Sequence, residues 1–244
     1  MKPPVWPPPL YSFLDYITNR VEDPPPGKKI LDCGAGGELP PLALFKDHGF
    51  ETYGIDISEE QIKKAGEYCN EYGVELDIRK GDMRNIPFDD ETFDLVYEYC
   101  SMPHMTKKDT AVTIKEITRV AKKGGYCFLG FILNYTWPLL GRERQEGSGE
   151  FWGGDESEEI IHSVFTEEET EDYLKGLEII RKDIWTTSET ERLKNVSWED
   201  WQKTWDTEKY PEEEKKRKYE QRIKLAKYSH IFYTLRKPIR PREG

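Results

Sequence analysis

An apolar segment runs directly into a glycine-rich turn near the N-terminus, in Ile30-Leu-Asp-Cys-Gly-Ala-Gly-Gly37. Gly34 and Gly36 carry no Cβ, so a ligand can approach the backbone closely there. A helical pattern follows over 39–48, which makes the unit strand, turn and helix. A dinucleotide site of the Rossmann type needs a third glycine three positions after the second, and Leu39 stands there. The sequence therefore disfavours a nicotinamide or flavin site.

Strand and helix patterns alternate as far as residue 133. We expect Lys122 and Lys123 to lie in the last turn of a helix that Gly124 ends. Alternation of this kind is typical of parallel βαβ units. The predicted strands are 29–33, 51–57, 74–79, 93–99 and 125–133, and the predicted helices are 10–21, 39–48, 58–72 and 109–123.

The alternation breaks after residue 133. Two insertions are expected, at 134–163 and 188–227. A capping box at Thr166-Glu-Glu-Glu169 predicts a helix between them, and strands are expected at 177–185 and 230–235. The predicted organisation is a proline-rich arm at 1–9, a single domain at 10–238 and a tail at 239–244.

Composition limits the partners of the chain. Its 244 residues carry a formal net charge of −11, which disfavours a nucleic-acid substrate because phosphate binding needs a basic face. No apolar run approaches the roughly 18 residues that span a bilayer, and the first ten residues do not resemble a secretory signal. The four cysteines have no zinc-site spacing, so we expect reduced thiols in a cytoplasmic protein without a metal site.

Further motifs follow the glycine turn in a fixed order. They are Tyr53-Gly-Ile-Asp-Ile-Ser58, Gly81-Asp-Met-Arg84, Phe93-Asp-Leu-Val-Tyr97 and Glu116-Ile-Thr-Arg-Val-Ala-Lys-Lys-Gly-Gly125. Together with the turn they resemble the class I S-adenosylmethionine-dependent methyltransferases. The resemblance is close over residues 10–133 and extends in outline over 166–185 and 228–238.

The first motif of that family is an acidic residue followed by glycines at alternate positions. Asp32, Gly34 and Gly36 match it, whereas Glu38 stands at the position of the third glycine. The resemblance implies an α/β, Rossmann-like class I methyltransferase fold with a seven-stranded, mostly parallel sheet, helices on both faces and the two late insertions. It also implies S-adenosylmethionine as the cofactor.

The resemblance assigns cofactor contacts by position. Asp32 would lie near the methionine ammonium, Asp56 would accept both ribose hydroxyls, and Asp82 would hold the adenine amino group. Tyr11 would reach the cofactor carboxylate, although core packing explains it equally well. The predicted cofactor-binding residues are Tyr11, Asp32, Gly34, Ala35, Gly36, Asp56, Ile57, Asp82, Met83 and Glu98.

Two residues after the fourth strand are candidate catalytic groups. His104 matches a histidine that is frequent there in small-molecule methyltransferases, and its ordinary pKa of about 6.5 suits a general base. Glu98 stands where the family more often has a small polar residue. It is a candidate for deprotonating the acceptor, for binding a cationic acceptor or for contacting the cofactor ammonium. A structural role for His104 remains the alternative.

Aromatic residues gather in the two insertions. Trp198, Trp201 and Trp205 share one face of an expected helix at 197–205, and this stripe is either core or a lid over an apolar acceptor. The predicted function is methyl transfer to an apolar or aromatic small molecule. A protein or RNA methyltransferase and a non-catalytic cofactor-binding regulator are the alternatives. The oligomeric state is left open.

Overall fold

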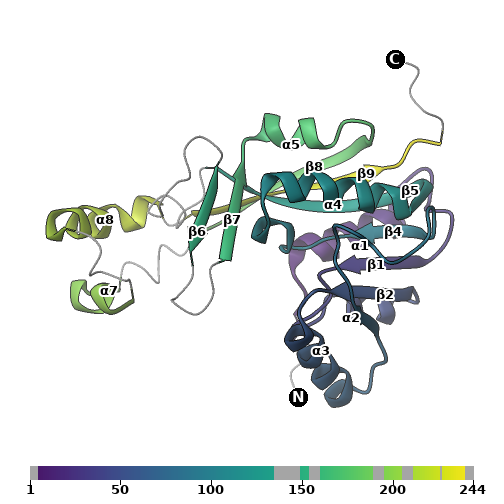
Figure 1. Cartoon of the computed structure of the whole chain (residues 1–244), viewed down its shortest axis with the longest axis horizontal. Coiled ribbons are helices and arrows are strands. Elements are labelled where there is room, and N and C mark those ends of the chain that lie inside the picture. Colours follow the sequence, from purple (N-terminus) through teal and green to yellow (C-terminus); the bar gives the residue numbers. More distant parts are fainter. Residues whose placement is uncertain are drawn as a thin grey trace.

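Helices and strands alternate along the first half of the chain, as the sequence predicts (Figure 1). The computed structural model describes residues 5–134, 149–153, 160–188, 195–204, 211–225 and 227–239. The helices are α1 (Pro8–Asn19), α2 (Leu42–Asp47), α3 (Glu59–Tyr72), the 3₁₀ helix η1 (Met102–His104), α4 (Lys107–Val120), α5 (Glu167–Tyr173), α7 (Trp198–Thr204) and α8 (Glu212–Leu225). The strands are β1 (Lys29–Cys33), β2 (Glu51–Asp56), β3 (Asp77–Lys80), β4 (Phe93–Tyr97), β5 (Ala121–Leu133), β6 (Glu150–Gly153), β7 (Ile160–Phe165), β8 (Glu178–Ser188) and β9 (Lys227–Arg236).

The sheet is built on parallel pairs in the order β3-β2-β1-β4-β5. Strand β9 pairs antiparallel with β5, and β8 pairs antiparallel with β9. The order β3-β2-β1-β4-β5-β9-β8 is therefore a seven-stranded, mostly parallel sheet, which confirms the prediction. The described sheet has nine strands because β7 and β6 add to β5.

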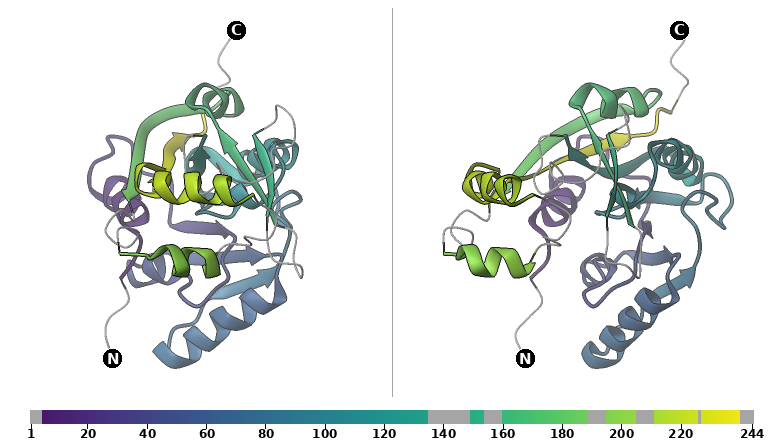
Figure 2. Two further views of the ribbon diagram at one scale, coloured as in Figure 1. Left: turned by 90° about the vertical axis from the view of Figure 1, so that its left-hand side faces the viewer. Right: turned by 60° about the vertical axis from the view of Figure 1, so that its left-hand side comes forward.

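Helices cover both faces of this sheet (Figure 2). One apolar cluster joins α1 and α2 to the strands, with Phe13 and Phe45 fully buried at its centre. A second cluster joins α4 and the segment after α5 to the opposite face through Ile117 and Leu177. The carboxyl ends of β1, β2 and β4 meet at one edge, where ligands bind in sheets of this kind.

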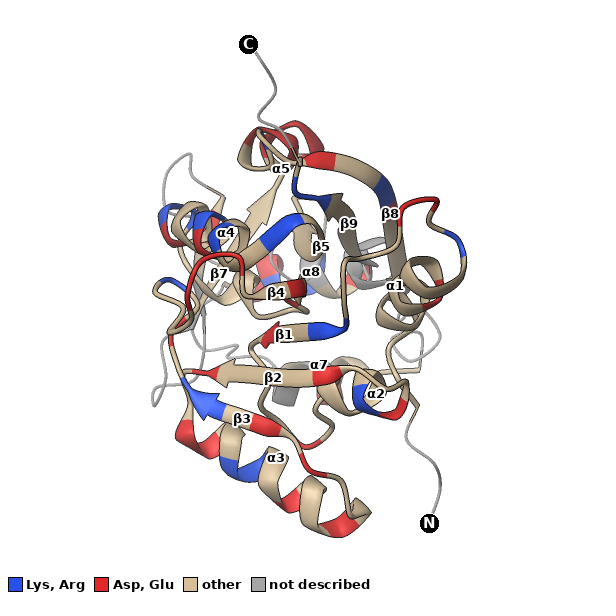
Figure 3. Ribbon diagram, turned by 90° about the vertical axis from the view of Figure 1, so that its right-hand side faces the viewer, with Lys and Arg blue, Asp and Glu red and all other residues tan. Residues whose placement is uncertain are grey.

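Charge is spread over the surface in both signs. On α3, Lys63 and Lys64 pair with Glu67 and Glu60 one turn away, and Figure 3 shows acidic and basic residues alternating along this helix. Exposed pairs of this kind contribute little to stability. Both signs of charge are therefore present on α3.

The junction of α4 and β5 differs from the prediction. The helix ends at Val120, and Lys122 and Lys123 lie in β5 rather than in the last helical turn. The reason is strand pairing, because Ala121 is fully buried opposite Phe93 of β4. Gly124 adopts a φ of 76° inside β5 instead of ending the helix.

The first insertion contains a strand hairpin that the sequence did not reveal. Strands β6 and β7 pair antiparallel, and β7 also pairs with Ile132 and Leu133 of β5. Because Ile132 already pairs with His230 of β9 on one edge, β7 must occupy the other edge of β5, beyond the end of β4. The hairpin therefore stands above the carboxyl end of β4.

The second insertion extends a long hairpin of β8 and β9, whose pairing continues to Ser188 and Lys227. The expected aromatic and charged helices are present as α7 and α8. Both lie to one side of the domain, away from β1 and β2 (Figures 1 and 2). The capping box at Thr166 is complete and begins α5, as predicted.

Asp94 fastens the amino-terminal edge of the sheet and gives a stability prediction. Its side chain is 1% exposed and accepts the Lys29 N–H at 2.9 Å and the Lys122 Nζ–H at 2.8 Å. Asp94→Ala leaves both donors without this acceptor, so we expect a loss of about 2–3 kcal/mol in the free energy of unfolding, measured in urea. Asp77→Ala breaks only an exposed pair with Arg79 and should cost below about 0.5 kcal/mol. Equal losses in the two variants would contradict this role.

Candidate functional site

The glycine turn packs tightly against the neighbouring loops. The N–H groups of Gly34 and Ala35 both donate to the Ile55 carbonyl, at 2.8 and 3.0 Å. A Cβ at Gly34 would lie 2.1 Å from Ser101 Oγ, and a Cβ at Gly36 would lie 2.5 Å from the Gln61 Cβ. Gly34 also has a φ of 107°, which disfavours any other residue. The packing of the neighbouring loops therefore requires glycine at both positions, whether or not a ligand is bound.

Asp56 is the last residue of β2 and is fixed by the backbone around it. One carboxylate oxygen accepts the Gly36 N–H at 2.9 Å, and the other accepts the Ser58 N–H at 2.8 Å. Each carboxylate oxygen has a second lone pair, so both can still accept hydroxyl groups. Ile57, the next residue, is apolar and 62% exposed, so its side chain is accessible to a ligand. The geometry suits the predicted ribose contact at Asp56.

Asp32 lies buried at the end of β1. Its side chain is 1% exposed, and the Tyr97 hydroxyl donates to Oδ2 at 2.6 Å. Burial raises the pKa of Asp32 to about 8, against the lowering effect of the Tyr97 hydrogen bond. The carboxyl therefore takes up a proton near neutral pH when no cation faces it.

Glu98 lies buried at the end of β4, the strand that neighbours β1. Its oxygens accept three backbone N–H groups, from Ser101 at 2.6 Å, Met102 at 3.1 Å and Gly130 at 3.4 Å. Burial raises its pKa to about 7, and the three hydrogen bonds lower it. Neither Asp32 nor Glu98 forms an ion pair with any residue that the structure describes. Two buried carboxyls beside the glycine turn fit a ligand with a cationic group.

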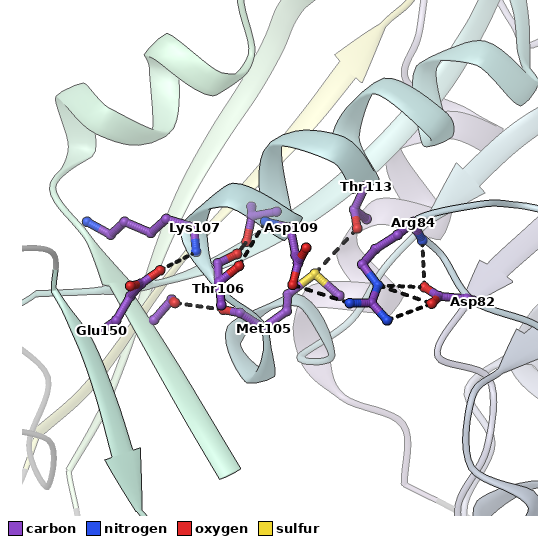
Figure 4. Close-up of polar contacts among 10 residues, drawn as sticks. Asp82, Arg84, Met105, Thr106, Lys107, Asp109, Thr113 and Glu150 are labelled. Atoms are coloured by element: carbon purple, nitrogen blue, oxygen red, sulfur yellow. Dashed lines mark hydrogen bonds and ion pairs between the residues drawn. The ribbon is translucent and has the colours of Figure 1, made fainter. Parts of the chain in front are cut away.

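Asp82 lies after β3 and is held by Arg84 (Figure 4). The Arg84 guanidinium donates to both oxygens of Asp82 and also reaches Asp109 at the start of α4, at 3.3 Å. The hydrogen bonds from Arg84 lower the pKa of Asp82, which keeps it ionised and able to accept. Met83 is partly buried near Gly34, where its methyl carbon lies 3.7 Å from the position of a Cβ. The loop after β3 thus adjoins the glycine turn.

Tyr11 lies on the exposed side of α1. It is 51% exposed on α1, and its ring packs edge-on against His48, with centroids 6.3 Å apart. His48 follows the end of α2, which is the end remote from the glycine turn. These contacts do not bring Tyr11 to Gly34, and its predicted cofactor contact stays a prediction.

His104 ends η1, and the hairpin of β6 and β7 holds this segment. Its ring lies 4.9 Å from that of His162 and is hydrogen-bonded to the Ile161 main chain. His104 is exposed as a residue, and partial desolvation of its ring by the neighbouring segments lowers the pKa of the imidazole. The Ser163 hydroxyl donates to the Met105 carbonyl at 2.7 Å, just after η1. His104 is therefore positioned by the first insertion.

Glu150 and Lys107 fix the same hairpin to α4. The Glu150 carboxylate accepts the Lys107 N–H at 2.6 Å, at the first turn of the helix (Figure 4). The Lys107 ammonium donates to Glu169 of α5 at 2.9 Å. Sequence reasoning missed these residues because no local pattern marks them.

Sequence reasoning also missed three residues around the predicted site: Tyr97, Ser101 and Arg84. Tyr97 faces Asp32 across paired strands, and Ser101 touches Gly34. Only Arg84 had a local signal, because it lies two residues after Asp82.

Other features are set apart from this site. A surface hollow between α4 and α5, lined among others by Ile114, Tyr173 and Leu177, contains none of the predicted site residues. Within the described ranges, no cluster of three His, Cys, Asp or Glu side chains could hold a metal ion. No helix among those ranges is long and apolar enough to cross a membrane.

Comparison with known proteins agrees with this arrangement. Residues 31–129 match the family described as a methyltransferase domain. The chain is 37% identical over 130 residues to 2-methyl-6-phytyl-1,4-hydroquinone methyltransferase of Synechocystis, which covers 50% of this chain and 39% of the relative. It is 35% identical over 102 residues to a sterol 24-C-methyltransferase of Gibberella zeae, which covers 41% and 26%. A solved S-adenosylmethionine-dependent methyltransferase of Methanosarcina mazei superposes with a TM-score of 0.63 at 19% identity, covering 92% of this chain and 97% of that one.

Residues 31–129 match a methyltransferase domain, and the fold is that of the class I S-adenosylmethionine-dependent methyltransferases. The chain spans less than half the length of the two curated relatives.

The buried carboxyl of Asp32 gives a prediction of pH dependence. Its pKa is about 8 in the folded chain and about 4 when unfolded. The folded protein keeps the proton where the unfolded chain has released it, so this group lowers the free energy of unfolding as pH rises from about 4 to about 8. The slope reaches about 1.4 kcal/mol per pH unit for one proton. In Asp32→Asn, which keeps an oxygen for Tyr97, we expect a flatter profile between pH 5 and 8.

Urea unfolding at several pH values measures how the free energy of unfolding changes with pH in the unmodified protein and in Asp32→Asn. Asp77→Asn changes an exposed carboxylate on β3 and serves as the control, with a profile parallel to that of the unmodified protein. A parallel profile for Asp32→Asn as well would show that Asp32 is ionised throughout this range.

Proposed function

We propose that the chain transfers a methyl group from S-adenosylmethionine to an apolar or aromatic small molecule. The observation that carries the proposal is the pair of buried carboxyls, Asp32 and Glu98, beside a glycine turn whose Gly36 N–H donates to Asp56. S-adenosylmethionine combines an ammonium group with ribose hydroxyls, which are the groups that these acids would bind. Asp82, with Met83 and Ile57, would hold the adenine.

The acceptor class is supported by the relatives and by the position of the insertions. The two curated relatives are named for a phytyl hydroquinone and a sterol, both largely apolar small molecules. In this chain the hairpin of β6 and β7 stands beyond the end of β4, at the ligand edge of the sheet. A pocket there would be built by the insertions, which vary most readily among proteins of one fold.

Methyl transfer requires the protein mainly to align the two reactants. When bound, S-adenosylmethionine supplies a methyl group on a positively charged sulfur. Asp32 and Glu98 would hold its ammonium group and Asp56 its ribose, and the bound cofactor would supply the methyl group to the acceptor atom, with the electrons of the carbon–sulfur bond remaining on sulfur. The protein holds the two reactants in line and excludes water. The acceptor proton, where one must leave, passes to a base.

His104 is our candidate for that base. Desolvation lowers the pKa of its imidazole, which favours the neutral form that can accept a proton, and the residue is exposed to an acceptor. One ring nitrogen is tied to the Ile161 main chain, which leaves the other available. Glu98 is fully buried and engaged by three N–H groups, so we assign it to the cofactor ammonium rather than to the acceptor.

The two insertions are proposed to form the cap over the acceptor. Trp198 packs on Tyr219 of α8, with ring centroids 5.3 Å apart. Trp198 is thus joined to the other helix of the same insertion. Of the remaining aromatic residues, Tyr135, Trp137 and Trp205 lie outside the described residues, as do the side chains of Trp152 and Trp201.

Incubation with S-adenosylmethionine labelled on its methyl group tests the reaction itself. The protein is given a cell metabolite extract and, separately, a protein and RNA extract. We expect label in the organic phase of the metabolite extract. Label in protein or RNA instead would favour a macromolecular acceptor, and binding of the cofactor without transfer to either extract would favour a regulator.

Asp56→Ala tests the ribose contact. The change removes two charge-assisted hydrogen bonds, each worth about 1.5–3 kcal/mol, so we expect at least tenfold weaker binding of S-adenosylhomocysteine by calorimetry. Asp47→Ala, at the end of α2, is a control that should bind normally. Unchanged affinity in a folded Asp56→Ala variant would exclude the ribose assignment.

Glu98→Gln and His104→Ala separate the cofactor site from the base. With an accepted substrate, His104→Ala should lower kcat about 10²-fold or more while cofactor affinity stays within about threefold. Glu98→Gln should instead weaken cofactor binding, because it removes the charge opposite the ammonium. Normal turnover in His104→Ala would leave alignment alone as the source of catalysis.

A further inference from the structure

Aromatic rings form a row on the sheet face that α1 covers. Phe13 stacks on Phe128, with centroids 4.8 Å apart, and Phe128 stacks on Phe232 at 5.3 Å and 5°. Phe232 in turn lies parallel to two further rings. Tyr99 is 5.7 Å away and His230 is 5.9 Å away, each at 15°. The row therefore runs from beneath α1 to Tyr99 and His230.

The row ends at the ligand edge of the sheet. Phe232 of β9 lies opposite Gly130 of β5, and a Cβ on that glycine would lie 2.7 Å from the Phe232 ring. Gly130 also donates its N–H to Glu98, whose other oxygen holds the Ser101 loop against Gly34. A continuous chain of contacts thus joins the last rings of the row to the predicted cofactor site.

Exposure changes along the row. Phe13, Phe128 and Phe232 are buried, whereas Tyr99 and His230 are partly exposed. Trp185 lies opposite His230 across β8 and β9 and is 36% exposed. Burial lowers the pKa of His230, so its ring is uncharged at pH 7. Because the His230 ring carries no charge, stacking a ligand ring on it does not incur the cost of removing water from a charged group.

We propose that Tyr99 and His230 form the binding surface for a flat aromatic acceptor, whose ring adds to the end of the row. The parallel orientation of the existing rings favours a planar occupant, because offset stacking needs ring planes nearly parallel at 4.5–7 Å. A saturated ring of the same size lacks this interaction. The proposal rests on the proposed function and narrows its acceptor to planar aromatic molecules.

Binding of 2-naphthol, measured by calorimetry with S-adenosylhomocysteine present, tests the surface. We expect 2-naphthol to bind at least about fivefold more tightly than decahydro-2-naphthol, which has the same carbon skeleton but is not planar. The proton NMR resonances of 2-naphthol should shift upfield on binding, because its ring would stack on other rings. His230→Ala should weaken 2-naphthol about two- to tenfold, the range that one ring pair supplies, and His230→Phe should restore it.

Tyr72→Leu is the matched control, because Tyr72 stacks on Tyr68 of α3 in a second parallel pair, at 4.5 Å. It should leave 2-naphthol affinity unchanged. Tyr99→Leu serves as the second variant and should weaken 2-naphthol as His230→Ala does. Affinity for S-adenosylhomocysteine should stay within about twofold in every variant.

Three results would overturn the proposal: equal affinity for the planar and saturated probes, no 2-naphthol binding by the unmodified protein, or losses in the ring variants no larger than in Tyr72→Leu. Any of these with normal S-adenosylhomocysteine binding would leave the methyltransferase function standing. Failure of the unmodified protein to bind S-adenosylhomocysteine would contradict the proposed function itself.

Discussion

The burial of two carboxyls at the ends of adjacent strands is the constraint on which the rest of this structure depends. Asp32 accepts a hydrogen bond from the Tyr97 hydroxyl of β4, and Glu98 is the residue after Tyr97. An ionised carboxylate without a cation is costly in such surroundings, and the pKa values of about 8 and 7 express that cost. The domain tolerates it by supplying a tyrosine hydroxyl and three backbone N–H groups. A bound cation would offset the cost of burying these charges. We therefore assign the ends of β1 and β4 to ligand binding rather than to the core.

The loop after β4 is where the distant parts of the chain meet. Glu98 turns this loop back through Ser101 and Met102, and Ser101 then closes on Gly34. From the other side, the β6–β7 hairpin holds the same loop through Ser163, while Glu150 caps α4 just beyond it. A change in the first insertion would therefore move His104 relative to the cofactor site. The position of His104 thus depends on contacts made by the first insertion.

Several of the predicted site residues lie together at one edge because the motifs that carry them are local to the strand ends. Asp32, Gly34, Gly36 and Asp56 lie in short motifs around strand ends, and the structure brings these motifs to one edge. The contacts of Arg84 with Asp82 are also local, spanning two residues. Tyr11 was assigned by its place in an N-terminal helix, and its contact with His48 depends instead on how α1 crosses the sheet. The orientation of one helix on a sheet has no signature in the helix itself.

The sequence by itself determined the alternation of strands and helices, the glycine turn, the N-terminal caps of α3 and α5, and the acids at the ends of β1 and β2 and after β3. These depend on residues close together in the chain, where side-chain pattern and backbone preference act directly. Only the tertiary structure decided that α4 stops at Val120, since Ala121 is needed opposite Phe93. It alone placed β7 beyond β4, and it alone aligned Tyr99, Phe232 and His230 in one row. Such arrangements are set by pairing and packing between residues up to more than a hundred positions apart, and no local stretch of sequence carries that information.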